Sequence, residues 1–180
     1  MSIQTAIENK LAFLTKASKQ EWIKAGVFAS VAGAVSIVFS SYFGIYVDTS
    51  ETRCLPEVVY VGYPRSETLN RGDVVSFIAD RNVMFGAFKG HRVAKIVVGM
   101  AGDRIQSDEF GVVVNGRKVA DRSTETLGRM NARGFVPINM DRTLQPGELF
   151  VMGVLPRSFD SRYWGVINER SVERLVKPLI

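Results

Sequence analysis

The longest apolar stretch of the chain lies near its N-terminal end. Residues 25–47, AGVFASVAGAVSIVFSSYFGIYV, contain no charged side chain. A helix of this length spans roughly 34 Å, enough to cross the roughly 30 Å hydrocarbon core of a bilayer. Its small residues would suit a cleavage site, but the run exceeds the apolar core of about 7–15 residues found in cleavable signal peptides. We therefore predict an uncleaved transmembrane helix over 25–47.

The residues before this run show a weaker helical pattern. Ile7, Leu11 and Leu14 recur at helical spacing, and Trp22 follows less regularly. One interpretation of residues 1–24 is an amphipathic cytoplasmic segment whose lysines face anionic lipid. A weakly ordered tail is the other interpretation.

After residue 48 the pattern changes to short runs rich in β-branched residues. They are DVVSFIA (73–79), RVAKIVVG (92–99), GVVVNGRKV (111–119), ELFVMGV (148–154) and SVERLVKPL (171–179). Such runs, separated by Gly, Pro, Asn and Asp, predict strands. Asn115-Gly116 predicts a two-residue hairpin, and LNRGD and LQPGE predict turns before strands. The fold class is therefore mainly β, with a domain over 48–180 after a single transmembrane helix, and 122–139 is interpreted as an insertion or flexible loop.

Length and composition narrow the function classes. The 180 residues, 46% of them hydrophobic, allow one globular domain with appendages. Lys and Arg number 23 against 18 Asp and Glu, a net charge of +5 that we interpret as a solvated basic surface with no nucleic-acid partner. One cysteine excludes an internal disulfide, and one histidine without metal-ligand spacing argues against a metal site. We expect no metal and no other cofactor.

Charges on the two sides of the apolar run predict its orientation. Four lysines precede the run and two carboxylates follow it: Lys10, Lys16, Lys19, Lys24, Asp48 and Glu51. The positive-inside rule places the N-terminus in the cytoplasm. The sequence thus predicts a single-pass inner-membrane protein whose domain over 48–180 is periplasmic.

Five strings, in this order and spacing, resemble the conserved boxes of type I signal peptidases. They are NRGDVVSF (70–77), VAKIVVGMAGDRI (93–105), VVVNGRKV (112–119), GELFVMG (147–153) and SFDSRYWG (158–165), and the resemblance extends from about residue 52 to residue 178. CLPEVVY, followed by Arg71-Gly72-Asp73, is more similar to the TraF-type pilin-maturation peptidases of conjugative transfer. In that branch the nucleophile is the serine of a Ser-x-Pro motif, and this sequence has Cys54 at that position.

The resemblance implies a catalytic dyad of Cys54 and Lys95. A free lysine has a pKa near 10.4 and is charged at neutral pH, whereas burial among apolar neighbours such as Val93 and Val97 disfavours the charged form. A thiol is more acidic than a hydroxyl, so the sequence allows two protonation states of the dyad. One is a thiolate–ammonium pair, and the other is a thiol beside a neutral amine that acts as the base. A lysine reaching solvent from a strand edge, and a buried cysteine in a pseudo-enzyme, are the alternatives.

Thr52 and Ser66 are two further hydroxyl residues near Cys54 in sequence. The resemblance implies an oxyanion site formed by the Cys54 backbone N–H with the Thr52 hydroxyl. Ser66 is the alternative nucleophile, because SETLNRGD is superficially like the serine motif of the general secretory enzymes. Counting back from Gly72, however, places Pro64 at that serine position.

Asp160, Ser161 and Arg162 match the terminal Asp-Ser-Arg box of the family. Their implied role is an Asp–Arg pair that holds strands together near the lysine, with Ser161 able to hydrogen-bond the amine. A surface ion pair worth about 0–1 kcal/mol is the alternative. The sequence departs from the family at Val154-Leu155, where Asp-Asn is usual, so support of the active site is expected to differ here.

These features together predict a membrane-anchored endopeptidase that processes an exported proprotein. The resemblance to the conjugative branch implies a pilin or another transfer component as substrate, with an extended segment of small residues paired onto a strand edge. A general secretory signal peptidase I and a non-catalytic, membrane-anchored assembly factor of the same fold are the alternatives. Expected partners are the proprotein and inner-membrane lipid, and the sequence leaves the oligomeric state and a cyclising transfer after cleavage open.

Overall fold

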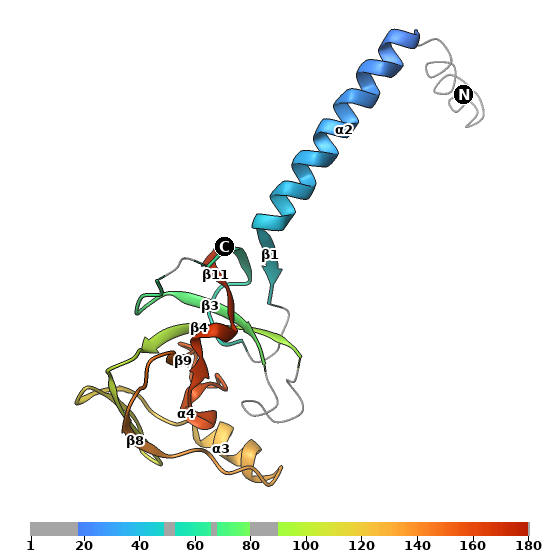
Figure 1. Cartoon of the computed structure of the whole chain (residues 1–180). Coiled ribbons are helices and arrows are strands. Elements are labelled where there is room, and N and C mark those ends of the chain that lie inside the picture. The colour runs from blue at the N-terminus through green and yellow to red at the C-terminus, as the bar shows by residue number, and fades with distance from the viewer. Residues whose placement is uncertain (1–17, 49–52, 66–67, 80–89, 180) are drawn as a thin grey trace, which may run out of the picture. The chain divides into compact units, whose positions relative to one another are not determined.

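The computed structural model describes residues 18–48, 53–65, 68–79 and 90–179 (Figure 1). The chain forms two units, Met1–Tyr42 and Phe43–Ile180. Thr52, Ser66 and residues 1–17 of the predicted amphipathic segment lie outside the described residues. The second unit contains every described strand, so the mainly β fold with one N-terminal apolar helix is confirmed.

The apolar helix of the first unit is α2 (Lys19–Tyr42), with 24 residues and none buried. Ser18 begins it with reciprocal bonds: the Glu21 carboxylate accepts from the Ser18 N–H at 2.6 Å, and the Ser18 hydroxyl accepts from the Glu21 N–H at 3.3 Å. The helix starts before the predicted residue 25 because Ser18 caps it ahead of the first turns, which contain the charged residues Glu21 and Lys24. It ends before the predicted 47 because Gly44–Val47 forms a strand. In the described part of the chain it is the one helix long and apolar enough to cross a membrane.

Two antiparallel sheets make up the second unit. The larger has seven strands in the order β1-β2-β11-β3-β4-β9-β10, and the smaller has four in the order β7-β6-β5-β8. The larger sheet contains β1 (Gly44–Val47), β2 (Val59–Pro64), β3 (Val74–Ile78), β4 (Arg92–Gly99), β9 (Glu148–Met152), β10 (Ile167–Asn168) and β11 (Val172–Pro178). The smaller contains β5 (Arg104–Asp108), β6 (Gly111–Val114), β7 (Arg117–Ala120) and β8 (Met140–Thr143). Thus β11, the last of these strands in the chain, lies between β2 and β3.

All five predicted β runs contain strands, and the predicted turns are present. Asn115 and Gly116 have φ of 50° and 80° between β6 and β7, as the hairpin requires. Gly72 and Gly147 have φ of 94° and 81° before β3 and β9. The interpretation of 122–139 as a loop was wrong in part, because it contains helix α3 (Thr124–Asn131), whose N-cap Ser123 accepts from the Thr126 N–H.

The hydrophobic core consists of three clusters around the larger sheet. The main cluster includes Val75, Phe77, Val97 and Val151, and a second joins the smaller sheet through Ile105, Val112, Phe150 and Met152. A third, formed by β2, β11 and the segment before β2, comprises Leu55, Tyr60 and Val176. Strand β9 therefore packs into two clusters, with alternate residues on opposite faces. After β9, the short helix α4 (Ser161–Trp164) buries all four of its side chains, and the 3-10 helix η1 (Glu169–Ser171) leads into β11.

Candidate active site

Cys54 and Lys95, which are 41 residues apart, meet in the folded domain. The Lys95 Nζ donates a hydrogen bond to the Cys54 Sγ. Lys95 is only 1% exposed, whereas Cys54 is half-buried and lines a pocket. The alternative of a lysine reaching solvent is therefore wrong, and the structure places a buried amine directly against a thiol that a ligand can approach.

The surroundings of Lys95 are those of a core residue. It occupies β4 directly opposite Val75 of β3, and Val97 follows on the same strand face. Both valines belong to the main hydrophobic cluster. Among the described residues no carboxylate forms a salt bridge with Lys95. Because an unpaired buried charge is costly, this environment fits a neutral amine beside a thiol, or an ammonium paired with the Cys54 thiolate.

A second hydroxyl contact fixes the amine. The Ser158 Oγ accepts a hydrogen bond from the Lys95 Nζ at 3.2 Å, and Ser158 is completely buried. Ser161, expected at the amine, instead accepts the backbone N–H of Val151 at 2.9 Å. The expectation for Ser161 was therefore wrong. Both serines lie in the string SFDSR, and the chain turns into α4 between them, which directs the earlier hydroxyl to the lysine.

Asp160 and Arg162 form a buried pair. The Arg162 Nε donates to the Asp160 Oδ1 at 2.8 Å and its Nη2 donates to the Oδ2 at 2.7 Å, with side chains 5% and 0% exposed. The interpretation as a surface ion pair is therefore wrong. Burial on its own lowers the pKa of Arg162, but the hydrogen bonds and negative charge of Asp160 outweigh it and raise that pKa above its ordinary value. The guanidinium thus stays charged.

The Asp160–Arg162 pair holds the loop over residues 153–158. Asp160 Oδ2 accepts the Gly153 N–H at 2.9 Å, and Arg162 Nη2 donates to the Ser158 carbonyl oxygen at 3.3 Å. The pair therefore positions Ser158, and through it Lys95. It supports this loop rather than joining strands directly.

The same loop anchors the backbone of Cys54. The Cys54 carbonyl oxygen accepts the N–H of Val154 at 3.0 Å and that of Leu155 at 3.4 Å. A Cβ atom on Gly153 would lie 2.5 Å from this carbonyl oxygen, so only glycine permits the approach. The departure from the family at Val154-Leu155 does not affect these contacts, because they use backbone atoms.

Thr52 and Ser66 cannot be placed in this geometry, since both lie outside the described residues. The implied oxyanion role of Thr52 and the alternative role of Ser66 therefore stay predictions. Within the described part of the chain, the Cys54 N–H donates no hydrogen bond to a protein acceptor.

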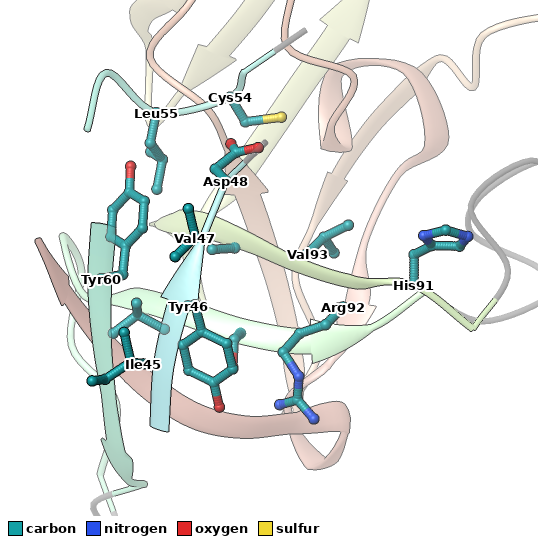
Figure 2. Close-up of a pocket in the computed structure, with 13 residues that line it drawn as sticks. Ile45, Tyr46, Val47, Asp48, Cys54, Leu55, Tyr60, His91, Arg92 and Val93 are labelled. Atoms are coloured by element: carbon teal, nitrogen blue, oxygen red, sulfur yellow. The ribbon is translucent and has the colours of Figure 1, made fainter. Parts of the chain in front are cut away.

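Next to Cys54 lies a cavity of about 440 Å³ (Figure 2). In Figure 2 the Cys54 sulfur lies at the top of the view and Arg92 at the bottom. The walls come from the segment around β1 and from β2, β3, β4 and β11. Burial, together with the negative charge of Glu57, raises the pKa of Tyr60 in this wall to about 12, and its hydroxyl donates to the Glu57 carbonyl oxygen at 2.8 Å. His91 is exposed at the pocket.

The pocket and dyad offer covalent chemistry with a nucleophilic thiol. Among the described residues no group of three or more His, Cys, Asp or Glu side chains is placed to hold a metal ion. The contact between a thiol and an amine that can take its proton is an arrangement suited to nucleophilic attack by sulfur.

Comparison with known proteins agrees with the resemblance drawn from the motifs. Residues 19–177 match the family model described as signal peptidase, peptidase S26. A crystal structure of a signal peptidase I from Enterococcus faecalis V583 is 25% identical and covers 61% of this chain and 97% of that chain, with a TM-score of 0.39. A search of the curated proteins finds no match.

Proposed function

The chain belongs to the signal peptidase family, peptidase S26, and from this premise we propose that it is a membrane-anchored endopeptidase with Cys54 as nucleophile and Lys95 as proton carrier. Its substrates are exported precursor proteins. The single observation that carries the proposal is the hydrogen bond from the buried Lys95 amine to the Cys54 thiol.

Acylation begins when the Cys54 sulfur attacks the scissile carbonyl carbon. The thiol proton moves to the Lys95 amine, either before the attack, as a thiolate–ammonium pair, or during it. The backbone N–H of Cys54, with the Thr52 hydroxyl, stabilises the oxyanion. The C–N bond then breaks, Lys95 protonates the leaving amine, and a thioester to Cys54 remains.

Deacylation reverses the roles of the same groups. Water attacks the thioester carbonyl and gives a proton to the now neutral Lys95 amine. The C–S bond breaks, the thiolate takes this proton back from Lys95, and the new carboxyl end of the precursor leaves. Ser158 keeps the amine on the side of the sulfur throughout, and the Cys54 carbonyl is held by the loop over 153–158.

The finer assignment is to the TraF-type branch, with a pilin or another conjugative transfer component as substrate. The support is the placement of Cys54 in CLPEVVY, ahead of Arg71-Gly72-Asp73. An extended segment with small residues before the scissile bond is proposed to bind along the pocket next to Cys54. A general secretory signal peptidase and a non-catalytic assembly factor remain the competing functions.

The proposed location is the inner membrane, with residues 1–24 cytoplasmic, residues 25–42 of α2 spanning the lipid, and the domain that begins with β1 in the periplasm. The apolar helix α2 fits a membrane anchor, and the flanking lysines support this orientation. A reporter that is active only in the periplasm should work when fused after residue 60 and fail when fused within the first 20 residues. The opposite pattern would place the peptidase domain in the cytoplasm and contradict the proposal.

Cleavage of purified precursors tests the nucleophile. The full-length protein in detergent is incubated with candidate propilins and with a general secretory precursor, and products are identified by mass spectrometry. Cys54→Ala should be inactive, and an alkylating agent should inactivate the unmodified enzyme in step with labelling of Cys54. Cys54→Ser should retain some activity, because the amine that accepts the proton is still present, and the acyl group should be trapped as a thioester only with the cysteine.

The outcomes separate the candidate functions. Cleavage of the propilin alone supports the conjugative branch, and cleavage of both precursors supports the secretory enzyme. Full activity of Cys54→Ala together with loss of activity in Ser66→Ala would identify Ser66 as the nucleophile. A folded protein that cleaves neither, and whose Cys54→Ala variant has no phenotype in cells, would identify an assembly factor.

A further inference from the structure

The side-chain hydroxyl of Ser76 is buried and lacks a hydrogen bond in the described part of the chain. It is 2% exposed, and its Oγ has no hydrogen-bond partner among the described residues. It also lines the pocket that contains Cys54. Buried hydroxyls almost always have a partner, because leaving one unpaired costs free energy. An unpaired hydroxyl in the wall of a pocket is therefore a site at which a ligand can supply the missing bond.

The strand register shows which side chains lie around this hydroxyl. In the run VVSFI of β3, Val75 and Phe77 point to the main hydrophobic cluster, so Ser76 points to the opposite face. Directly opposite on β4 lies Ala94, whose side chain has no polar atom. On the other side of β3, Arg174 of β11 lies directly opposite Ser76, and no hydrogen bond joins it to the Ser76 Oγ in the described part of the chain.

The walls near Ser76 are otherwise apolar or already bonded. Leu55, Tyr60 and Val176 form a hydrophobic cluster there, with Ala94 packed against it. The Tyr60 hydroxyl donates to the Glu57 carbonyl oxygen at 2.8 Å. A side chain that enters beside Ser76 thus meets an apolar wall with one hydroxyl, which distinguishes a small polar side chain from a small apolar one.

We infer that Ser76 is a specificity-determining residue that hydrogen-bonds the hydroxyl of a serine or threonine in the bound substrate segment. The inference rests on the proposed function in taking that segment to be a substrate. In an extended segment alternate side chains share a face, so the selected residue is the first or the third before the scissile bond. An alanine at the same place leaves the Ser76 hydroxyl unpaired and binds less well.

Peptide chloromethyl ketones test this without a known precursor. The Cys54 sulfur attacks the methylene carbon, a C–S bond forms, and chloride leaves, so labelling needs only the thiol and the pocket. Tripeptide probes carry Ala or Ser, and in a second pair Val or Thr, at the first or the third position. Intact-mass measurements on the full-length protein in detergent give the labelling rates, peptide mapping confirms Cys54 as the site, and iodoacetamide corrects for the reactivity of the thiol.

At one of the two positions, the unmodified protein should react about threefold to tenfold faster with the hydroxyl probe of each pair. Ser76→Ala should bring this ratio to about one, because only the bonded partner is lost. Ser76→Thr, which keeps a hydroxyl, should retain the preference. Ser171→Ala, a serine outside the pocket, should leave the ratio as in the unmodified protein.

Two results would overturn the inference. The first is a ratio that is the same in the unmodified protein and in Ser76→Ala. The second is a lower unfolding temperature of Ser76→Ala, because removal of an unpaired buried hydroxyl should leave that temperature equal or higher. Failure of precursor cleavage would contradict the proposed function without changing the labelling ratios, so the two failures are distinguishable.

Discussion

Arg104 of the smaller sheet and Lys95 of the larger sheet lie in opposite environments. In the smaller sheet, β5 alternates exposed and buried positions, so that Ile105 and Ser107 point inward while Arg104 points outward. Arg104 pairs there with Asp141 at 2.9 Å, with side chains 61% and 53% exposed. In the larger sheet, β4 carries Lys95 into the core. The same antiparallel architecture thus keeps one set of charges in water and buries another.

The comparison of Arg104 with Lys95 identifies a position at which burial of an ionisable side chain lowers the stability of the fold. A charge at the surface costs little, whereas a buried amine must be desolvated and needs specific partners. Lys95 has two partners, the Cys54 thiol and the Ser158 hydroxyl. A position at which a chain retains such a side chain, where an apolar residue would pack as well, is a strong indication of function.

The contrast is tested most strongly by replacing one lysine from each sheet. Lys95→Met removes the amine while keeping a similar shape, and should lower the rate of precursor cleavage by about a thousandfold. Lys95→Arg should not restore it, because a guanidinium does not give up its proton. Lys118→Ala, in the smaller sheet and 58% exposed, should change the rate less than about twofold. Substantial cleavage by Lys95→Met would remove this lysine from the mechanism.

A smaller effect, on stability, is expected from the two acidic partners of arginine. Asp160→Asn leaves the buried Arg162 guanidinium without its counter-charge and should lower the free energy of unfolding by about 3–5 kcal/mol. Asp141→Asn, its counterpart in the smaller sheet, should cost about 0–1 kcal/mol. Urea denaturation of the two variants at pH 7 measures both values. Equal costs would show that burial does not distinguish the two pairs.

A smaller effect than that of Asp160→Asn is expected at Asp103, which joins the two sheets. It precedes β5 and pairs with Arg71, in the turn before β3, at 2.7 Å. Burial on its own raises the pKa of Asp103, but hydrogen bonds from the Met100 N–H, Asn115 and Arg71 outweigh it and hold that pKa below its ordinary value of 3.8. Asp103→Asn should therefore cost about 1–2 kcal/mol at pH 7.

The pH dependence follows from the direction of this shift. Because the pKa of Asp103 is lower in the folded chain than in the unfolded chain, its stabilisation is fully present above 3.8 and is lost as the pH falls below that value through the folded pKa. The difference in unfolding free energy between the unmodified protein and Asp103→Asn should therefore shrink below pH 3.8. A difference that stays constant down to pH 2 would contradict this role.

Sequence patterns predicted the larger sheet better than the smaller one. The apolar runs of β3, β4, β9 and β11 are visible because these strands are buried on much of both faces. Strand β5, RIQSD, was missed because its single large apolar residue is Ile105 and its other positions are polar. Strand β1 was missed because it continues the apolar run of the helix, and hydrophobicity alone does not show where a helix gives way to a strand.

The candidate site was predicted in part. Motif resemblance named Cys54 and Lys95, and the structure brings them together. It assigned Ser161 to the amine and did not consider Ser158, because which serine reaches the lysine depends on the turn between them. Ser76 had a signal that was not used: it is the one polar residue in the apolar strand VVSFI, where a hydroxyl must be buried.

The position of β11 has a consequence for the order in which the pocket forms during synthesis of the chain. Because β11 lies between β2 and β3, the pocket wall containing Tyr60, Ser76 and Val176 needs a strand that the ribosome makes after all the others. Until then β2 and β3 lack the strand that pairs with both of them, and the strand pairs that complete this wall join residues 95 to 118 positions apart. A nascent chain that has not yet added β11 therefore carries Cys54 and Lys95 without this pocket wall.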